Sequence, residues 1–181
     1  MGCGKSYLGK VLAQKLGFLF VDLDSIIENT SRNNRDRNNR EGGIIAEIFE
    51  KFGETHFRKI ESERLRGLQK WDEVVVATGG GAACFNENMA WMNENGITVY
   101  LKTNPYLLLE RLSSQTEARP LLRGKSSKEL LDFITTKVSE REKFYLQAHI
   151  IVEQTEDGEA IIFDILEKIL EIRQLKAAPQ N

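Results

Sequence analysis

The sequence has little cysteine, no excess of positive charge and no long apolar run, and each absence excludes a class of protein. Its two cysteines, Cys3 and Cys84, are too few for a disulfide framework and lie at no metal-binding spacing, which favours a reducing compartment such as the cytoplasm. A net charge of −2 argues against nucleic-acid binding. No stretch reaches the roughly 18 apolar residues of a membrane span, and no signal-peptide pattern is visible. We therefore expect a soluble, monomeric protein without a nucleic-acid or membrane partner.

Short apolar runs alternate with helical patterns along the 181 residues. Four runs are typical of buried parallel strands: Phe18–Asp24, Glu73–Gly81, Thr98–Leu101 and His149–Val152. Strands that alternate with helices indicate an α/β fold around a parallel sheet, and the length predicts a single domain over residues 1–181.

One segment, Asn29–Gly43, interrupts this pattern. It holds five Asn, four Arg and two Gly and no apolar residue, so it has no face to bury and we expect a flexible surface insertion. An alternative is that its arginines and asparagines touch an anion or RNA.

The first six residues, MGCGKS, fit two incompatible patterns. Gly2, Cys3 and Ser6 fit a lipidation signal, with myristate on the glycine and palmitate on the cysteine. The same letters are the tail of a phosphate-binding P-loop, whose first glycine would lie two residues before Met1. In that interpretation backbone N–H groups and a helix N-terminus hold phosphate, Lys5 reaches the β- and γ-phosphates, and the Ser6 hydroxyl binds Mg²⁺.

Two acidic residues, Asp22 and Asp24, end the first expected strand, where open α/β sheets place their ligands. Alternate strand residues point the same way, so both carboxylates would face one crevice near the metal. The alternative for Asp24 is a plain helix N-cap.

Two further stretches indicate a phosphate or sugar-like ligand. Gly79, Gly80 and Gly81 follow a buried strand, and three glycines in succession indicate a ligand against the main chain. Arg119 lies in a polar stretch, about residues 113–127, that is typical of a mobile lid bringing a cation to the triphosphate.

Together these motifs resemble the shikimate kinase family, in its order and nearly its spacing. The resemblance is carried by the stretches GCGKSYLGKVLAQKL, FVDLDSIIE, IFEKFGETHFRKIE, VVVATGGG, ARPLL and SEREKFY. It implies a three-layer P-loop fold like that of nucleoside-monophosphate kinases, with sheet order 2-3-1-4-5 and strand 1 missing from this chain. It also implies ATP-dependent, Mg²⁺-aided phosphorylation of the shikimate 3-hydroxyl in aromatic amino-acid biosynthesis.

The resemblance assigns a role to each motif residue. Asp22 matches the acid that supports Mg²⁺ beside Ser6, and Asp24 the acid that hydrogen-bonds shikimate and acts as the base. Arg58 and Arg141 match the arginines that clasp the shikimate carboxylate. The remaining matches are Gly79, Gly80 and Gly81 for the shikimate ring, Arg119 for the lid, Arg111 for adenine, and Gly2, Cys3, Gly4, Lys5, Ser6 and Tyr7 for the nucleotide phosphates. The alternative for Arg58 is pairing with Glu54 or Glu61 on its own helix, and Glu61 could also hold Arg58 in place for the ligand.

Three departures from the family pattern leave rival functions open. The first strand is absent, Asn29–Gly43 is about ten residues longer than usual, and Lys143 stands where the family has proline after Arg141. The rivals are a polyol kinase acting on a substrate such as gluconate, and an inactive nucleotide-binding or lipid-anchored homologue. Because a chain without its central strand would be barely folded, we predict that Met1 is an internal residue of a longer protein.

Overall fold

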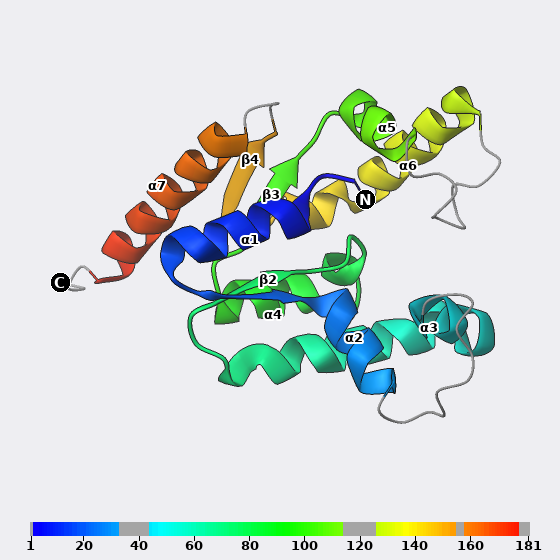
Figure 1. Cartoon of the computed structure of the whole chain (residues 1–181), viewed down its shortest axis with the longest axis horizontal. Coiled ribbons are helices and arrows are strands. Elements are labelled where there is room, and N and C mark those ends of the chain that lie inside the picture. Colours follow the sequence, from blue (N-terminus) through cyan, green and yellow to red (C-terminus); the bar gives the residue numbers. More distant parts are fainter. Residues whose placement is uncertain (1, 33–43, 114–125, 155–157, 178–181) are drawn as a thin grey trace. The chain divides into compact units, whose positions relative to one another are not determined.

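The computed structural model describes residues 2–32, 44–113, 126–154 and 158–177, and this part of the chain falls into two compact units. One unit is Ser6–Asn95, and the other joins Met1–Lys5 to Gly96–Asn181. The first contains most of α1 (Lys5–Leu16), then β1 (Leu19–Asp22), α2 (Leu23–Arg32), α3 (Ile44–Gly67), η1 (Leu68–Lys70), β2 (Val74–Ala77), η2 (Ala82–Cys84) and α4 (Asn88–Asn95). The second contains β3 (Val99–Lys102), α5 (Pro105–Ser113), α6 (Ser127–Tyr145), β4 (Ile150–Glu153) and α7 (Gly158–Ala177) (Figure 1).

The unit Ser6–Asn95 is built on a parallel pair of strands. β1 pairs with β2 from Leu19↔Val74 to Asp22↔Ala77, and α2 packs against α3 (Figure 1). The apolar faces of these elements form a core of Leu23, Ile27, Ile48, Phe57, Leu65 and Leu68. Burial of large apolar side chains is the main stabilising term in a fold of this size.

A sharp bend divides α3 in two. Gly53 has φ 78° and ψ 173°, a conformation that is open to glycine and strained for other residues. The bend separates Ile44–Phe52 from the longer helical stretch that carries Glu54, Arg58 and Glu61.

The other unit contains the second parallel pair, with β3 beside β4 from Val99↔Ile150 to Lys102↔Glu153. α5 packs against α6 around a core of Leu108, Leu112, Leu130 and Ile134, and α7 packs against β4. A capping box begins α6, because the side chain of Ser126 accepts from the backbone N–H of Glu129 and the Glu129 carboxylate accepts from the backbone N–H of Ser126. Each pair is a separate two-stranded parallel sheet in the described part of the chain.

Two expectations about element boundaries are wrong. β1 ends at Asp22 and α2 begins at Leu23, so Asp24 lies in the first turn of a helix and strand alternation does not orient it. Apolar Leu23 and Ile27, both fully buried against α3, explain why the helix begins early. α2 also continues to Arg32, so the first part of the expected insertion is helical. The rest of that insertion lies outside the described residues, as does most of the expected lid.

Among the described residues, the structure has no helix that is both long enough and apolar enough to cross a membrane.

Candidate active site

The loop before α1 has the backbone shape of an anion-binding loop. Gly2 and Gly4 have φ of 70° and 78°, and α1 begins immediately afterwards at Lys5. A Cβ on Gly2 would lie 3.0 Å from Cγ of Leu112, so a larger residue would also displace the loop. Left-handed residues before a helix N-terminus leave backbone N–H groups available to phosphate oxygens.

The side chains of this loop segregate by exposure. The Lys5 ammonium lies 3.6 Å from the Sγ atom of Cys3, and both side chains are partly buried. Tyr7, on the first turn of α1, is 68% exposed. Lys5 therefore remains beside the loop, and Tyr7 extends toward solvent.

Ser6 and Asp22, the two residues that the sequence assigns to Mg²⁺, are hydrogen-bonded to each other. The Ser6 hydroxyl donates to Oδ2 of Asp22 at 2.8 Å, and Oδ1 of Asp22 accepts from the backbone N–H of Asp24 at 3.1 Å. The structure contains no group of three or more His, Cys, Asp or Glu residues suited to a metal within its described residues. A hydroxyl next to a carboxylate fits Mg²⁺, which keeps several waters and needs only one or two protein oxygens.

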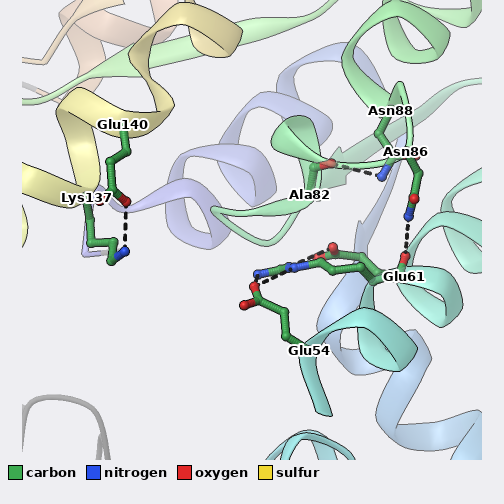
Figure 2. Close-up of polar contacts among 8 residues, drawn as sticks. Glu54, Glu61, Ala82, Asn86, Asn88, Lys137 and Glu140 are labelled. Atoms are coloured by element: carbon green, nitrogen blue, oxygen red, sulfur yellow. Dashed lines mark hydrogen bonds and ion pairs between the residues drawn. The ribbon is translucent and has the colours of Figure 1, made fainter. Parts of the chain in front are cut away.

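Arg58 is bound by two carboxylates of its own helix. Its Nη1 donates to Oε2 of Glu61 at 2.8 Å, and its Nη2 and Nε donate to Oε1 of Glu54 at 2.9 Å and 3.1 Å (Figure 2). The guanidinium also lies over the rings of Phe57 and Phe85, 5.1 Å and 4.6 Å from their centroids. Both pairings that the sequence left open therefore form together.

Burial and charge oppose each other at Arg58, which is only 8% exposed. Burial alone would lower the pKa of its guanidinium, but the hydrogen bonds and negative charges of Glu61 and Glu54 outweigh it and raise the pKa. Arg58 therefore keeps a full positive charge in a largely desolvated place, where a hydrogen bond to a carboxylate is strong.

The glycine segment after β2 approaches this arginine closely. A Cβ on Gly79 would lie 2.8 Å from Oε1 of Glu61 and 3.3 Å from Oδ1 of Asp24, and a Cβ on Gly81 would overlap the guanidinium of Arg58. The structure thus brings Asp24 and Arg58 to the glycine segment, and side chains of the chain itself approach Gly79 and Gly81. Glycine is required here by close approach of side chains.

Arg111 belongs to a second polar cluster, in the other unit. Its Nη1 donates to Oε1 of Gln154 at 3.0 Å, and the Thr103 hydroxyl donates to the same oxygen at 2.7 Å. Nε2 of Gln154 lies 3.5 Å from the position that a Cβ on Gly4 would take. Gln154 therefore connects the end of β4 to α5 and to the loop before α1 that holds Gly2 and Gly4.

Arg141 lies on the last part of α6. The neighbouring residues of α6 contact β3. Lys102 pairs with Glu142 at 3.5 Å, and the rings of Tyr100 and Tyr145 are 5.0 Å apart. Burial, and then the charge of Glu142, raises the pKa of Tyr100 to about 12, so its hydroxyl stays protonated at neutral pH. Arg119 lies outside the described residues.

Sequence reasoning missed Gln154 and two asparagines, Asn86 and Asn88, that contact the glycine segment and α3. None of them belongs to a short motif, and their partners are more than five residues away in the chain. The local signal was that the two asparagines open the helical pattern of Asn86–Asn95, a position where asparagine commonly forms turns and caps.

Comparison with known proteins gives a consistent family. The shikimate kinase model matches residues 1–170. The shikimate kinase of Azobacteroides pseudotrichonymphae is 44% identical over 83% of this chain and 84% of that protein. The crystal structure of shikimate kinase from Bacteroides thetaiotaomicron has a TM-score of 0.81 at 39% identity and covers 94% of each chain. Shikimate kinase from Acinetobacter baumannii in complex with shikimate has a TM-score of 0.75 at 32% identity, over 99% of this chain and 91% of that one.

Proposed function

Because the chain belongs to the shikimate kinase family, we propose that it transfers the terminal phosphoryl group of ATP to the 3-hydroxyl of shikimate. The chain is a kinase of the P-loop α/β type that phosphorylates shikimate in the aromatic amino-acid pathway. The observation that carries the finer proposal is the cluster of Asp24, Arg58 and the glycine segment, which combines a buried cation with a carboxylate and close main chain.

The substrate roles follow from the chemistry of these groups. Arg58 binds the shikimate carboxylate through its guanidinium, and Arg141 supplies a second positive charge. The backbone of Gly79, Gly80 and Gly81 contacts the ring. Asp24 accepts a hydrogen bond from the hydroxyl that reacts.

The residues that bind the nucleotide lie in the loop before α1, in the first turn of α1 and on α5. Backbone N–H groups from Gly2 to Tyr7 and the ammonium of Lys5 bind the phosphates, and Arg111 stacks on adenine. Arg119 closes on the triphosphate. Ser6 and Asp22 hold Mg²⁺, which when bound neutralises charge on the phosphate oxygens.

The transfer depends on position and charge more than on a strong base. The 3-hydroxyl oxygen forms a bond to the γ-phosphorus, the bond to the β,γ-bridging oxygen breaks, and the hydroxyl proton passes to Asp24. Lys5 and Arg119 stabilise the charge that spreads over the transferred group.

The test is a substrate panel combined with one conservative variant. Purified protein with ATP should phosphorylate shikimate, and gluconate should give no turnover above background. Arg58→Lys keeps a positive charge beside the buried carboxylate of Glu61 but loses the guanidinium fork, so the shikimate KM should rise about tenfold or more while the ATP KM changes less than twofold. Turnover of gluconate in preference to shikimate, or an unchanged shikimate KM in Arg58→Lys, would contradict the proposal.

A further inference from the structure

A turn of strained backbone follows the glycine segment and leads into α4. Asn86 and Glu87 have φ of 52° and 56°, in the left-handed region that few residues other than glycine adopt. Asparagine is tolerated there better than most residues, but such strain persists only where surrounding contacts determine it. The contacts made by this turn therefore indicate which part of the structure depends on its strained conformation.

The side chain of Asn86 ends on the helix that carries Arg58. Its Nδ2 donates to the backbone oxygen of Arg58 at 3.0 Å and to the Ser62 hydroxyl at 2.8 Å. The same hydroxyl donates to the Arg58 oxygen at 2.9 Å. Three polar groups thus meet at the main chain of the residue assigned to the substrate carboxylate.

The side chain of Asn88 contacts the main chain beside the glycine segment Gly79–Gly81. Asn88 is 0% exposed, and its Nδ2 donates to the backbone oxygen of Ala82 at 2.9 Å, one residue after the glycine segment (Figure 2). Its Oδ1 accepts from Arg66 of α3 at 3.1 Å, and Arg66 donates to the backbone oxygen of Asn86 at 2.8 Å. The Arg66 guanidinium can only donate and the Ala82 carbonyl can only accept, so these two partners fix the orientation of the Asn88 amide.

The contacts of Asn86 and Asn88 are important because there is little space between the glycine segment and the side chains of α3. Gly79 and Gly81 lie so near to Glu61 and Arg58 that neither site has room for a Cβ. A shift of about 1 Å between the segment and α3 would change the space around the guanidinium, and a misplacement of that size is enough to lower an enzyme's activity.

We propose that Asn86 and Asn88 form a clamp that sets the distance between the glycine segment and Arg58, and thereby sets the affinity for shikimate. Both are positioning residues, because they act through the main chain of Arg58 and Ala82. The inference rests on the proposed assignment of Arg58 and the glycine segment to the substrate.

The main test is Asn86→Gly, with steady-state kinetics and thermal unfolding measured together. Glycine adopts the left-handed conformation without strain, so the turn is kept and only the two amide hydrogen bonds are lost. The shikimate KM should rise about five- to tenfold, the size expected for one or two hydrogen bonds. The ATP KM should stay within twofold, and the Tm close to that of the parent protein.

Asn88→Ala is the second variant, and Asn95→Ala is its matched control. Asn88→Ala leaves the buried carbonyl of Ala82 without its side-chain donor, so it should raise the shikimate KM at least as much and also lower the Tm. Asn95 lies on the same helix and also donates to a backbone oxygen, that of Trp91, at 2.8 Å, and its Oδ1 accepts from Gln69 at 3.0 Å. Its replacement should leave both KM values unchanged.

The outcomes separate the clamp from the site assignment. A shikimate KM within twofold of the parent in Asn86→Gly, with Arg58→Lys impaired, would refute the clamp and keep the assignment. An unchanged shikimate KM in both variants would refute both. Because Asn86→Gly relieves strain, it remains informative if Asn88→Ala fails to fold.

Discussion

At the scale of single residues, the charge balance around Arg58 is the feature with the clearest consequence for binding. One guanidinium already faces two carboxylates, and a carboxylated substrate would bring a third. The two partners differ sharply, because the Glu54 side chain is 54% exposed and the Glu61 side chain 1%. Glu61 is therefore the fixed partner, and Glu54 is the one that can give way to a substrate.

We predict that Glu54→Gln lowers the shikimate KM. The amide can still accept a hydrogen bond from Arg58, but it no longer offsets the charge that attracts the substrate. An exposed ion pair is worth about 0.2–1 kcal/mol, so the shikimate KM should fall by up to about fivefold. Glu47→Gln, which removes the i,i+4 pair with Lys51 on the same helix, is the control and should leave the shikimate KM unchanged. A higher shikimate KM in Glu54→Gln would mean that Glu54 holds Arg58 in place instead.

At the scale of elements, α3 depends on one backbone conformation. The bend at Gly53 lets the residues before it, including Ile48, reach the core while the residues after it present Arg58 and Glu61. Gly53 has open space around the position of a Cβ, so only its backbone angles forbid another residue.

We predict that Gly53→Ala destabilises the protein through backbone strain alone. The conformation should cost about 1–3 kcal/mol for alanine, which corresponds to a fall in Tm of several degrees in a chain of this size. Gly67→Ala is the matched control, because Gly67 has helical angles of φ −61° and ψ −20° and equally open space. The Tm of that variant should stay the same or rise. Equal Tm values for the two variants would show that the bend is not strained for alanine.

At the scale of the whole molecule, the insertion is the part that the fold needs least. α2 continues to Arg32 and α3 begins at Ile44, so the dispensable segment is narrower than the composition alone indicates. Residues 33–43 hold three arginines and four asparagines and no apolar side chain, so they cannot contribute to a core.

We predict that replacing residues 33–43 by a Gly/Ser linker of about six residues leaves kcat unchanged and moves the Tm by only a few degrees, since loop-closure entropy varies slowly with length. A Gly/Ser linker of the original length separates the effect of the arginines from that of length. A large loss of activity with both linkers would show that the arginines contribute to substrate capture.

Local patterns in the sequence were sufficient for the four strands and for the choice of candidate site residues, whose roles stay predictions. The P-loop letters and the i,i+3 and i,i+4 pairs of Arg58 depend on residues that are neighbours in the chain or on one helix face, so spacing alone predicts them. The sequence placed Asp24 in a strand, whereas α2 already begins at Leu23. The reason is that Leu23 and Ile27 are buried against α3, a contact that local preference does not include.

Only the tertiary structure decided the contacts that hold these motifs in place. Asn86 meets Arg58 across 28 residues, Arg66 meets Asn88 across 22, and Arg111 meets Gln154 across 43. Such pairs leave no periodic trace, because a hydrogen bond between distant segments depends on how strands and helices pack and not on the spacing between the two residues. The glycine segment shows both sides: its three letters indicated a close approach, and packing determined that the approaching groups are Glu61 and Arg58.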